Sequence, residues 1–267
     1  MLSDDLKEIQ AKASGKNRFL VRNLVKEEIQ NYILNFVYQN SVYQQLIFTG
    51  GTALRKLYGL DRLSEDLDFD YTFRFDINDF LKNLKAYFVS KLQYKEAEFK
   101  VSGNGQTLFV RFPPEDIFVR CDFSKTTSSV FGLNKGMITA GKFRFLVNAY
   151  DLETMFANKI VAFLRRNFFK GNFQTIPLKG RDVYDLFWFL QLSAKSGYSL
   201  KPNPERLKAL TGNEVADLRK EVMQKVAKVQ SKVVYEDMLP LVESDLFLKE
   251  FLQVFETNIV KQIGMVM

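Results

Sequence analysis

The chain contains no histidine and a single cysteine, Cys121, among its 267 residues. The lack of histidine excludes a Ser-His-Asp or Cys-His catalytic relay and a zinc site of the usual Cys/His kind. One cysteine cannot form an intrachain disulfide, which is compatible with a reducing compartment. Any bound metal must therefore be held by oxygen ligands, which favours Mg²⁺ or Mn²⁺.

Long apolar segments are also missing. No uninterrupted apolar run approaches the ~20 residues that a membrane-spanning helix requires. Residues 1–10 are too acidic and polar for a signal peptide. We therefore expect a cytoplasmic protein with no membrane partner.

Positive charge is in excess, with 38 Lys and Arg against 31 Asp and Glu, for a net charge of +7. Such a surplus suits a phosphate-rich partner, such as nucleic acid or a nucleoside triphosphate. On charge alone, a basic protein with solvated lysines explains the surplus equally well. The 26 phenylalanines are interpreted mainly as core residues, because aromatic side chains supply large buried areas.

Strand patterns are confined to the first part of the chain, whereas helical patterns alone follow residue 150. The first part is predicted to form helices at 24–38, 52–57 and 78–92, strands at 46–48, 67–73, 96–101, 107–112, 117–123 and 142–147, and a turn at 102–105. The second part is predicted to form helices at 151–167, 182–192, 204–210, 214–229 and 244–263. This order predicts an α/β-type head followed by an α-helical lobe.

Two adjacent glycines, Gly50 and Gly51, lie between a predicted strand and a predicted helix. A Gly-Gly turn there lets backbone N–H groups approach a phosphate closely, helped by the helix dipole. Thr52 or Ser64 can add a hydroxyl to such a cradle. The turn is not a P-loop, because no Gly-Lys-Ser/Thr follows at the required spacing.

Three aspartates, Asp66, Asp68 and Asp70, alternate with Leu67 and Phe69 along one predicted strand. Successive side chains of a strand point to opposite faces, so the carboxylates share one face and the apolar side chains anchor the other. Adjacent carboxylates repel one another unless cations lie between them, and two divalent ions held there suit in-line phosphoryl displacement. Separately, the glycine turn and the Asp-x-Asp strand are most often structural, but their joint occurrence is far more specific.

A third carboxylate is expected on the strand at residues 117–123. There Asp122 shares a face with Phe118 and Arg120, and it fits either a third metal ligand or a base for an incoming hydroxyl. A surface ion pair with Arg120 is an equally good explanation. Cys121 lies on the opposite, apolar face and is interpreted as a core residue.

The helical part contributes candidate phosphate ligands. Lys159 and Arg166 are seven residues apart, so they share a helix face and could both contact a triphosphate. The alternative is an exposed basic stripe. Farther along, Asp182 lies where a helix N-cap is expected, and its structural role would be capping. Gly180 and Arg181 beside it could equally belong to a site.

These segments resemble the motifs of AbiEii-type nucleotidyltransferase toxins, which belong to type IV toxin–antitoxin and abortive-infection systems and have the MenT toxins as relatives. The matching segments are Gly50-Gly51-Thr52, Arg62-Leu63-Ser64-Glu65-Asp66-Leu67-Asp68-Phe69, Lys159 and Arg181-Asp182-Val183-Tyr184-Asp185-Leu186. The resemblance extends from about Phe48 to Leu190. It implies an α+β fold with a polymerase β-like nucleotidyltransferase core, a mixed sheet with flanking helices. We expect this core and its N-terminal helices in residues 1–149, and an α-helical C-terminal lobe contributing to the active site in residues 150–267.

The resemblance also implies residue roles. Asp66 and Asp68 match the metal-binding pair, Asp122 fits the third carboxylate, and Lys159 and Asp182 match the lysine and aspartate of the helical lobe. The implied reaction transfers a nucleoside monophosphate from an NTP to an acceptor, with Mg²⁺ (or Mn²⁺) as cofactor. In relatives the acceptor is the 3′ end of tRNA, which blocks aminoacylation and thereby translation. A cognate antitoxin is implied too, and its direct binding is left open.

Three alternatives stay open at this point. The acceptor could be a protein hydroxyl, or the chain could be a nucleotide- or tRNA-binding module without turnover. An RNA-cleaving toxin is disfavoured, because ribonucleases that use general acid–base catalysis usually rely on histidine. The preferred base, the acceptor and the oligomeric state have no signal in the sequence.

Overall fold

The computed structural model describes residues 2–102, 105–126, 128–166, 168–170, 174–176, 178–195 and 200–267. The chain forms two compact units, Met1–Thr127 with Leu133–Ala149, and Ser128–Gly132 with Tyr150–Met267. Ser128–Gly132, which we expected in the core domain, belongs to the second unit. Its Gly132 N–H donates to Oγ1 of Thr154 (2.9 Å), and its Gly132 carbonyl accepts from the Asp151 N–H (3.1 Å).

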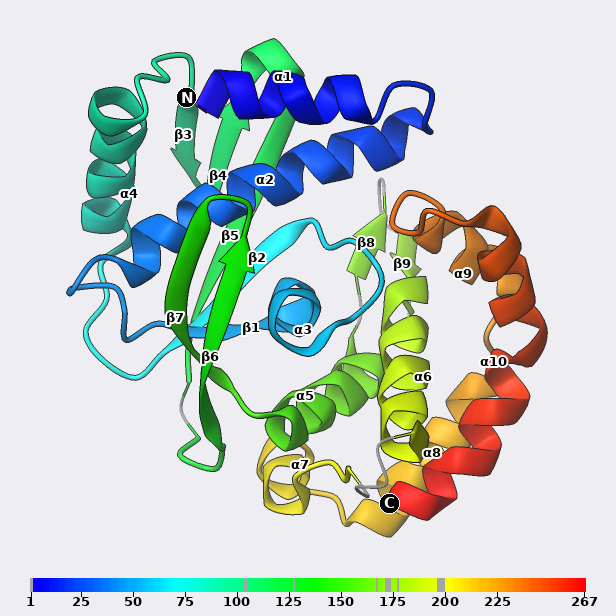
Figure 1. The fold of residues 1–267 in the computed structure, drawn as a ribbon. Coiled ribbons are helices and arrows are strands. Elements are labelled where there is room, and N and C mark those ends of the chain that lie inside the picture. Colours follow the sequence, from blue (N-terminus) through cyan, green and yellow to red (C-terminus); the bar gives the residue numbers. More distant parts are fainter. Residues whose placement is uncertain are drawn as a thin grey trace. The chain divides into compact units, whose positions relative to one another are not determined.

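Within the described residues, the first unit is built on a seven-stranded mixed sheet with flanking helices (Figure 1). Its strands are β1 (Ile47–Thr49), β2 (Asp66–Tyr71), β3 (Glu98–Val101), β4 (Thr107–Phe112), β5 (Ile117–Lys125), β6 (Leu133–Ala140) and β7 (Phe143–Tyr150). They lie in the order β3-β4-β5-β2-β1-β7-β6. Strand β2 runs antiparallel to β1 and parallel to β5, so the motif strands lie at the centre of the sheet.

The helices of this unit are α1 (Leu2–Lys12), α2 (Arg18–Tyr38), α3 (Gly50–Tyr58) and α4 (Ile77–Ala86), with α1 beside α2 in Figure 1. A row of stacked rings anchors the central strands. Phe69 on β2 stacks on Phe48 of β1 (5.7 Å between centroids) and on Phe123 of β5 (5.5 Å). All three rings are buried, and so are those of Phe36, Phe80, Phe88, Phe112 and Phe145, as expected for phenylalanines that fill the core.

The boundaries differ from the predictions in several places. The predicted helix at 78–92 is α4 followed by a π-helical turn, Tyr87–Lys91. Helix α1 and strand β6 were not predicted. Strand β6 has a neighbour on one side only and is largely exposed, so it lacks the apolar alternation by which strands are recognised. Gly103 and Asn104 of the predicted hairpin turn lie outside the described residues, and β3 and β4 on either side of them pair antiparallel as expected.

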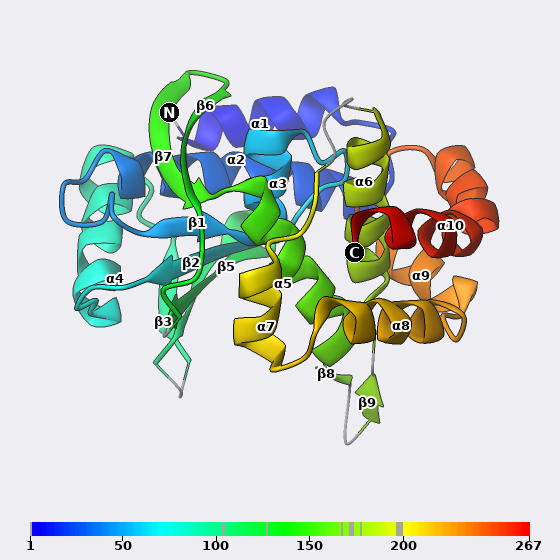
Figure 2. The same ribbon diagram turned by 90° about the horizontal axis from the view of Figure 1, so that it is seen from below.

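The second unit is mainly helical. Its elements are α5 (Leu152–Arg165), β8 (Phe168–Lys170), β9 (Gln174–Ile176), α6 (Gly180–Lys195), α7 (Pro204–Thr211), α8 (Val215–Val226), α9 (Ser231–Met238) and α10 (Asp245–Val266). Helix α6 packs against α5, α9 and α10 (Figures 1 and 2). The predicted helices are present, although Asn167 lies outside the described residues. Strands β8 and β9 and helix α9 were not predicted. Among the described helices, none is long and apolar enough to cross a membrane.

Candidate active site

The turn between β1 and α3 is built around Gly50. Its φ is +77°, a left-handed conformation that favours glycine. A Cβ on Gly50 would collide with the carboxylate of Asp68, at 2.7 Å from its Cγ. Thr49, at the end of β1, pairs in register with Asp68 on β2. The Asp68 carboxylate therefore packs directly on the backbone of the turn.

The second glycine of the turn is backed by a different segment. A Cβ on Gly51 would lie 2.8 Å from Oγ of Ser64 and 2.9 Å from Nη2 of Arg62. Both side chains are buried, and Arg62 is only 1% exposed. Its Nη1 donates to the carbonyl of Leu63 (2.9 Å). A cationic guanidinium thus lies behind a turn whose backbone N–H groups suit a phosphate.

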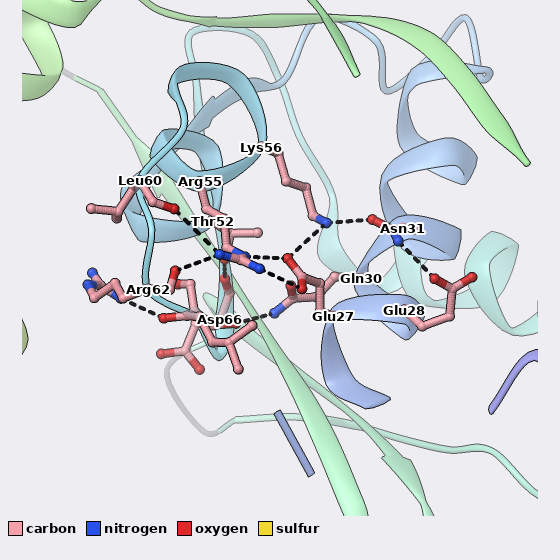
Figure 3. Close-up of polar contacts among 12 residues, drawn as sticks. Glu27, Glu28, Gln30, Asn31, Thr52, Arg55, Lys56, Leu60, Arg62 and Asp66 are labelled. Atoms are coloured by element: carbon pink, nitrogen blue, oxygen red, sulfur yellow. Dashed lines mark hydrogen bonds and ion pairs between the residues drawn. The ribbon is translucent and has the colours of Figure 1, made fainter. Parts of the chain in front are cut away.

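Thr52 also has a structural partner in this arrangement. It is fully buried, and its hydroxyl donates to the carbonyl of Asp66 at 2.5 Å (Figure 3). This bond joins the first turn of α3 to the first residue of β2. The Thr52 side chain is therefore committed to the backbone, which leaves its own N–H group as its contribution to a phosphate cradle.

The aspartates of β2 alternate in burial as their spacing predicts. Leu67 and Phe69 are fully buried, whereas Asp66, Asp68 and Asp70 are partly exposed. The three carboxylates therefore lie on the face opposite the aromatic core. A rigid strand with a packed reverse face restricts where these oxygens can move.

Asp122 lies on the neighbouring strand β5, in register with Asp68. Its carboxylate accepts a hydrogen bond from Oγ1 of Thr107 (2.6 Å) and lies 2.8 Å from Nε of Arg120. The ion pair with Arg120, one of the two interpretations of Asp122, is thus present. Its role as a third metal ligand stays a prediction.

The candidate ligands for a divalent cation on this face of β2 are two carboxylates, those of Asp66 and Asp68. In the part of the chain that the structure describes, no group of three or more His, Cys, Asp or Glu side chains is arranged around a common metal position. Asp66 and Asp68 nevertheless supply the carboxylate oxygens that Mg²⁺ and Mn²⁺ prefer. Asp68 is also held against a turn that a Cβ would fill. The donor chemistry of the pair therefore fits.

Cys121 is fully buried on β5, which confirms that it is a core residue. Burial raises the pKa of its thiol well above the ordinary value, and the carboxylates of Asp122, Asp66 and Asp68 act in the same direction. Such a thiol is neutral and inert at physiological pH.

In the second unit, two cations of the α5 segment meet two acids of α6. Nζ of Lys159 lies 2.6 Å from Oδ2 of Asp185, and Nη1 of Arg166 lies 3.3 Å from Oδ1 of Asp182. The acids are almost completely buried, with side-chain exposures of 0% for Asp185 and 1% for Asp182. The cations keep more surface, 12% for Lys159 and 34% for Arg166. Because both cations pair with acids of α6, they lie on one face of the α5 segment, as their spacing predicts.

Asp182 is not the N-cap that its position suggested. Helix α6 begins at Gly180, and Asp182 lies within the first turn, where its N–H donates to the carbonyl of Lys179 (3.0 Å). Among the residues that the structure describes, neither carboxylate oxygen has a hydrogen-bond partner, although Arg166 is close enough for charge attraction. A buried carboxylate without a hydrogen bond is costly for folding. Its retention is typical of a functional group.

The sequence matches, over residues 36–256, the family described as nucleotidyl transferase AbiEii toxin, type IV TA system. This match covers most of the chain and spans both groups of candidate residues. The chain belongs to the AbiEii nucleotidyltransferase toxin family. It is accordingly a nucleotidyltransferase toxin of the type IV toxin–antitoxin class, as its motifs indicated.

Solved structures show the same fold for this AbiEii-family chain. MenT4, the nucleotidyltransferase toxin Rv2826c from Mycobacterium tuberculosis H37Rv, is 16% identical with a TM-score of 0.62, over 98% of this chain and 89% of that one. JHP933 from Helicobacter pylori is 17% identical with a TM-score of 0.50, over 94% and 93% of the two chains. The predicted fold class is thereby confirmed. No curated protein matches the sequence.

Two charged residues of this AbiEii-family chain were quoted in its motifs without being predicted as site residues. Arg62 backs the Gly51 turn, and Asp185 is the partner of Lys159. Asp185 is a charged residue within an otherwise apolar run, which was the available signal for it, whereas Arg62 lies among other charged and polar residues and has no such signal. Spacing alone cannot reveal their partners, because each partner lies on another element.

Proposed function

We propose that this nucleotidyltransferase transfers a nucleoside monophosphate from an NTP to the 3′ end of tRNA, releases pyrophosphate, and thereby inhibits translation in the cytoplasm. The observation that carries the proposal is the packing of the Asp68 carboxylate on the Gly50 turn. It brings metal-ligand oxygens to the helix end where a triphosphate is best accommodated.

Within the first unit, the backbone N–H groups of Gly50, Gly51 and Thr52 cradle the triphosphate in this proposal, and Ser64 supports the turn. Asp66 and Asp68 hold Mg²⁺ or Mn²⁺, and Asp122 is the third carboxylate of the set. When bound, the divalent ion supplies positive charge to the phosphate oxygens and lowers the pKa of the attacking hydroxyl. The strand keeps the carboxylates in place before the substrate arrives, which avoids reorganisation during the reaction.

Within the second unit, Lys159 and Arg166 contact phosphate oxygens and neutralise the charge that develops on them. Asp185 orients Lys159, and Asp182, which has no hydrogen-bond partner in the described part of the chain, contributes a second carboxylate. We propose that residues 150–267 form a lobe that contributes these groups to the same reaction as the core of residues 1–149. A cognate antitoxin counteracts the enzyme, either by direct binding or without a stable complex.

The acceptor is the least constrained part of the proposal. The net charge of +7 supports a nucleic acid acceptor. The alternative acceptor is a protein hydroxyl, and a binding module without turnover is the remaining possibility.

The test is incubation of the purified protein and Mg²⁺ with total tRNA and each of the four α-labelled NTPs. Asp68→Asn removes the carboxylate at the turn, and Asp70→Asn makes the same change on the same strand face and serves as the matched control. We expect label on intact tRNA with the wild type and Asp70→Asn, and none with Asp68→Asn. Label that runs with protein and survives RNase would instead support the protein acceptor. An active Asp68→Asn variant would contradict the site assignment.

A further inference from the structure

Side chains of helix α2 hold residues 60–65, the segment that leads into strand β2, either directly or through Arg55. The carboxylate of Glu27 accepts two hydrogen bonds from Arg55 on α3, from Nε at 2.5 Å and from Nη2 at 3.1 Å (Figure 3). Two parallel bonds of this kind fix the direction of the guanidinium as well as its distance. Helix α2 therefore determines where Arg55 points.

The remaining nitrogen of Arg55 reaches the segment itself. Nη1 lies 3.5 Å from the carbonyl oxygen of Leu60 and 3.3 Å from that of Arg62 (Figure 3). Farther along, Nε2 of Gln30 donates to the carbonyl oxygen of Ser64 at 2.9 Å. The carbonyl oxygens of Leu60, Arg62 and Ser64 thus accept hydrogen bonds from side chains of α2 and α3.

The side chains of this segment support the glycine turn. Arg62 and Ser64 lie 2.9 Å and 2.8 Å from the position that a Cβ on Gly51 would take. The segment continues into Asp66, whose carbonyl accepts the Thr52 hydroxyl. A displacement of the segment therefore moves the back of the phosphate cradle and the start of the carboxylate strand together.

We propose that Glu27, Arg55 and Gln30 are positioning residues of the nucleotidyl-transfer site, acting through segment 60–65 on the Gly51 turn. This proposal rests on the proposed function, because it assumes that the turn binds the triphosphate. The residues contact no reacting atom, so their effect is on the geometry of the cradle. Displacements of about 1 Å in such geometry can cost up to roughly 100-fold in rate.

The charge state of Glu27 suits this role. Burial raises the pKa of its carboxyl, but the hydrogen bonds from Arg55 and the charge of Lys56 outweigh burial, and the pKa is lowered. The ion pair is therefore intact at neutral pH. The pair also lines a cavity of about 570 Å³ at the C-terminal end of α3, so substitutions here do not require repacking of the core.

The experiment compares Glu27→Gln with Glu28→Gln, a matched control on the same helix. Glu28 accepts a hydrogen bond from Asn31 (3.0 Å) on α2 itself. Binding of the α,β-methylene analogues of ATP, GTP, CTP and UTP with Mg²⁺ is measured by calorimetry, together with KM, kcat and the melting temperature. We expect Glu27→Gln to weaken analogue binding and raise KM by roughly 10-fold, with Glu28→Gln within twofold of the wild type.

Two further variants cover the case in which Glu27→Gln does not fold. Arg55→Lys keeps the charge but loses the two-nitrogen fork that bonds Glu27 and the Nη1 that reaches two carbonyls. Gln30→Met removes the donor to Ser64. Each should raise KM in the same direction as Glu27→Gln. A purely structural role predicts instead a lower melting temperature with unchanged KM and analogue affinity, and that outcome overturns the proposal. If the wild type binds none of the analogues, the proposed function fails first, and the two failures are thereby distinguished.

Discussion

The candidate site residues of the two units differ in which charge is buried. In the first unit the guanidinium of Arg62 is buried behind the glycine turn, while Asp66 and Asp68 keep exposed surface. In the second unit the carboxylates of Asp182 and Asp185 are buried. Their cationic partners, Lys159 and Arg166, stay partly exposed.

This difference indicates what each unit can bind. A buried charge is costly without an opposite charge nearby, so it dictates the sign of the groups around it. The first unit presents carboxylate oxygens on a strand, which suits a divalent cation. The second presents an ammonium and a guanidinium, which suit phosphate oxygens. The predictions below test this division of charge.

The largest effect is expected from Gly50→Ala, which places a Cβ against the Asp68 carboxylate. The matched control is Gly59→Ala, since Gly59 has a φ of +78° against +77° for Gly50 and nothing within 4 Å of its Cβ position. Both variants place an alanine at a positive φ, and only Gly50→Ala also places a Cβ against Asp68. We expect Gly50→Ala to lower kcat by roughly 100-fold or more. Equal losses in both variants would show that strain, and not the carboxylate, is responsible.

A second prediction concerns the buried acid of the second unit. Lys159→Ala leaves Asp185 buried without its cation and should lower the free energy of unfolding by about 3–5 kcal/mol. Adding Asp185→Leu should recover much of that stability without recovering activity. Urea unfolding and the transfer assay measure the two quantities separately. Lys208→Ala, which breaks the exposed pair with Glu214, is the control and should leave both unchanged.

The third prediction separates the ligands of the two units. Arg166→Ala should weaken NTP binding in the presence of EDTA by roughly 10-fold. Asp66→Asn and Asp68→Asn should leave that binding intact while lowering the affinity for Mn²⁺. Calorimetry with NTP and electron paramagnetic resonance with Mn²⁺ give the two affinities. A loss of Mn²⁺ binding in Arg166→Ala would contradict the division of charge.

The smallest effect concerns two adjacent carboxylates of α2. Burial raises the pKa of Glu27, but Arg55 and Lys56 lower it below the ordinary value of 4.5, so the stability it contributes is present above pH 4.5. That contribution is lost as the pH falls through the lowered pKa. Burial raises the pKa of Glu28, so its ionised form disfavours folding at neutral pH. Glu27→Gln should therefore lower the melting temperature at pH 7, and Glu28→Gln should not. Melting curves at decreasing pH should show both variants converging with the wild type as the carboxyls of Glu27 and Glu28 become protonated.

The local sequence pattern was sufficient to predict the features that depend on a single helix or strand. Alternation in residues 66–70 placed the three aspartates on one face of β2, and the seven-residue spacing placed Lys159 and Arg166 on one face. The helix α9 was missed because a short helix gains its stability from packing, and the backbone of its residue Val234 lies against Gly180. Asp182 was misjudged as a cap because a preference for the N-cap position says nothing of where α6 begins.

The absence of histidine restricts metal binding to oxygen ligands, and the two-residue period of a strand orients Asp66 and Asp68. These two properties follow from residue identity and from neighbouring positions in the sequence. Which charges are buried, and with which partners, follows from packing between elements far apart in the chain. Glu27 meets Arg55, and Lys159 meets Asp185, across 28 and 26 positions. No local periodicity encodes such a meeting, because it depends on how complete helices pack in three dimensions.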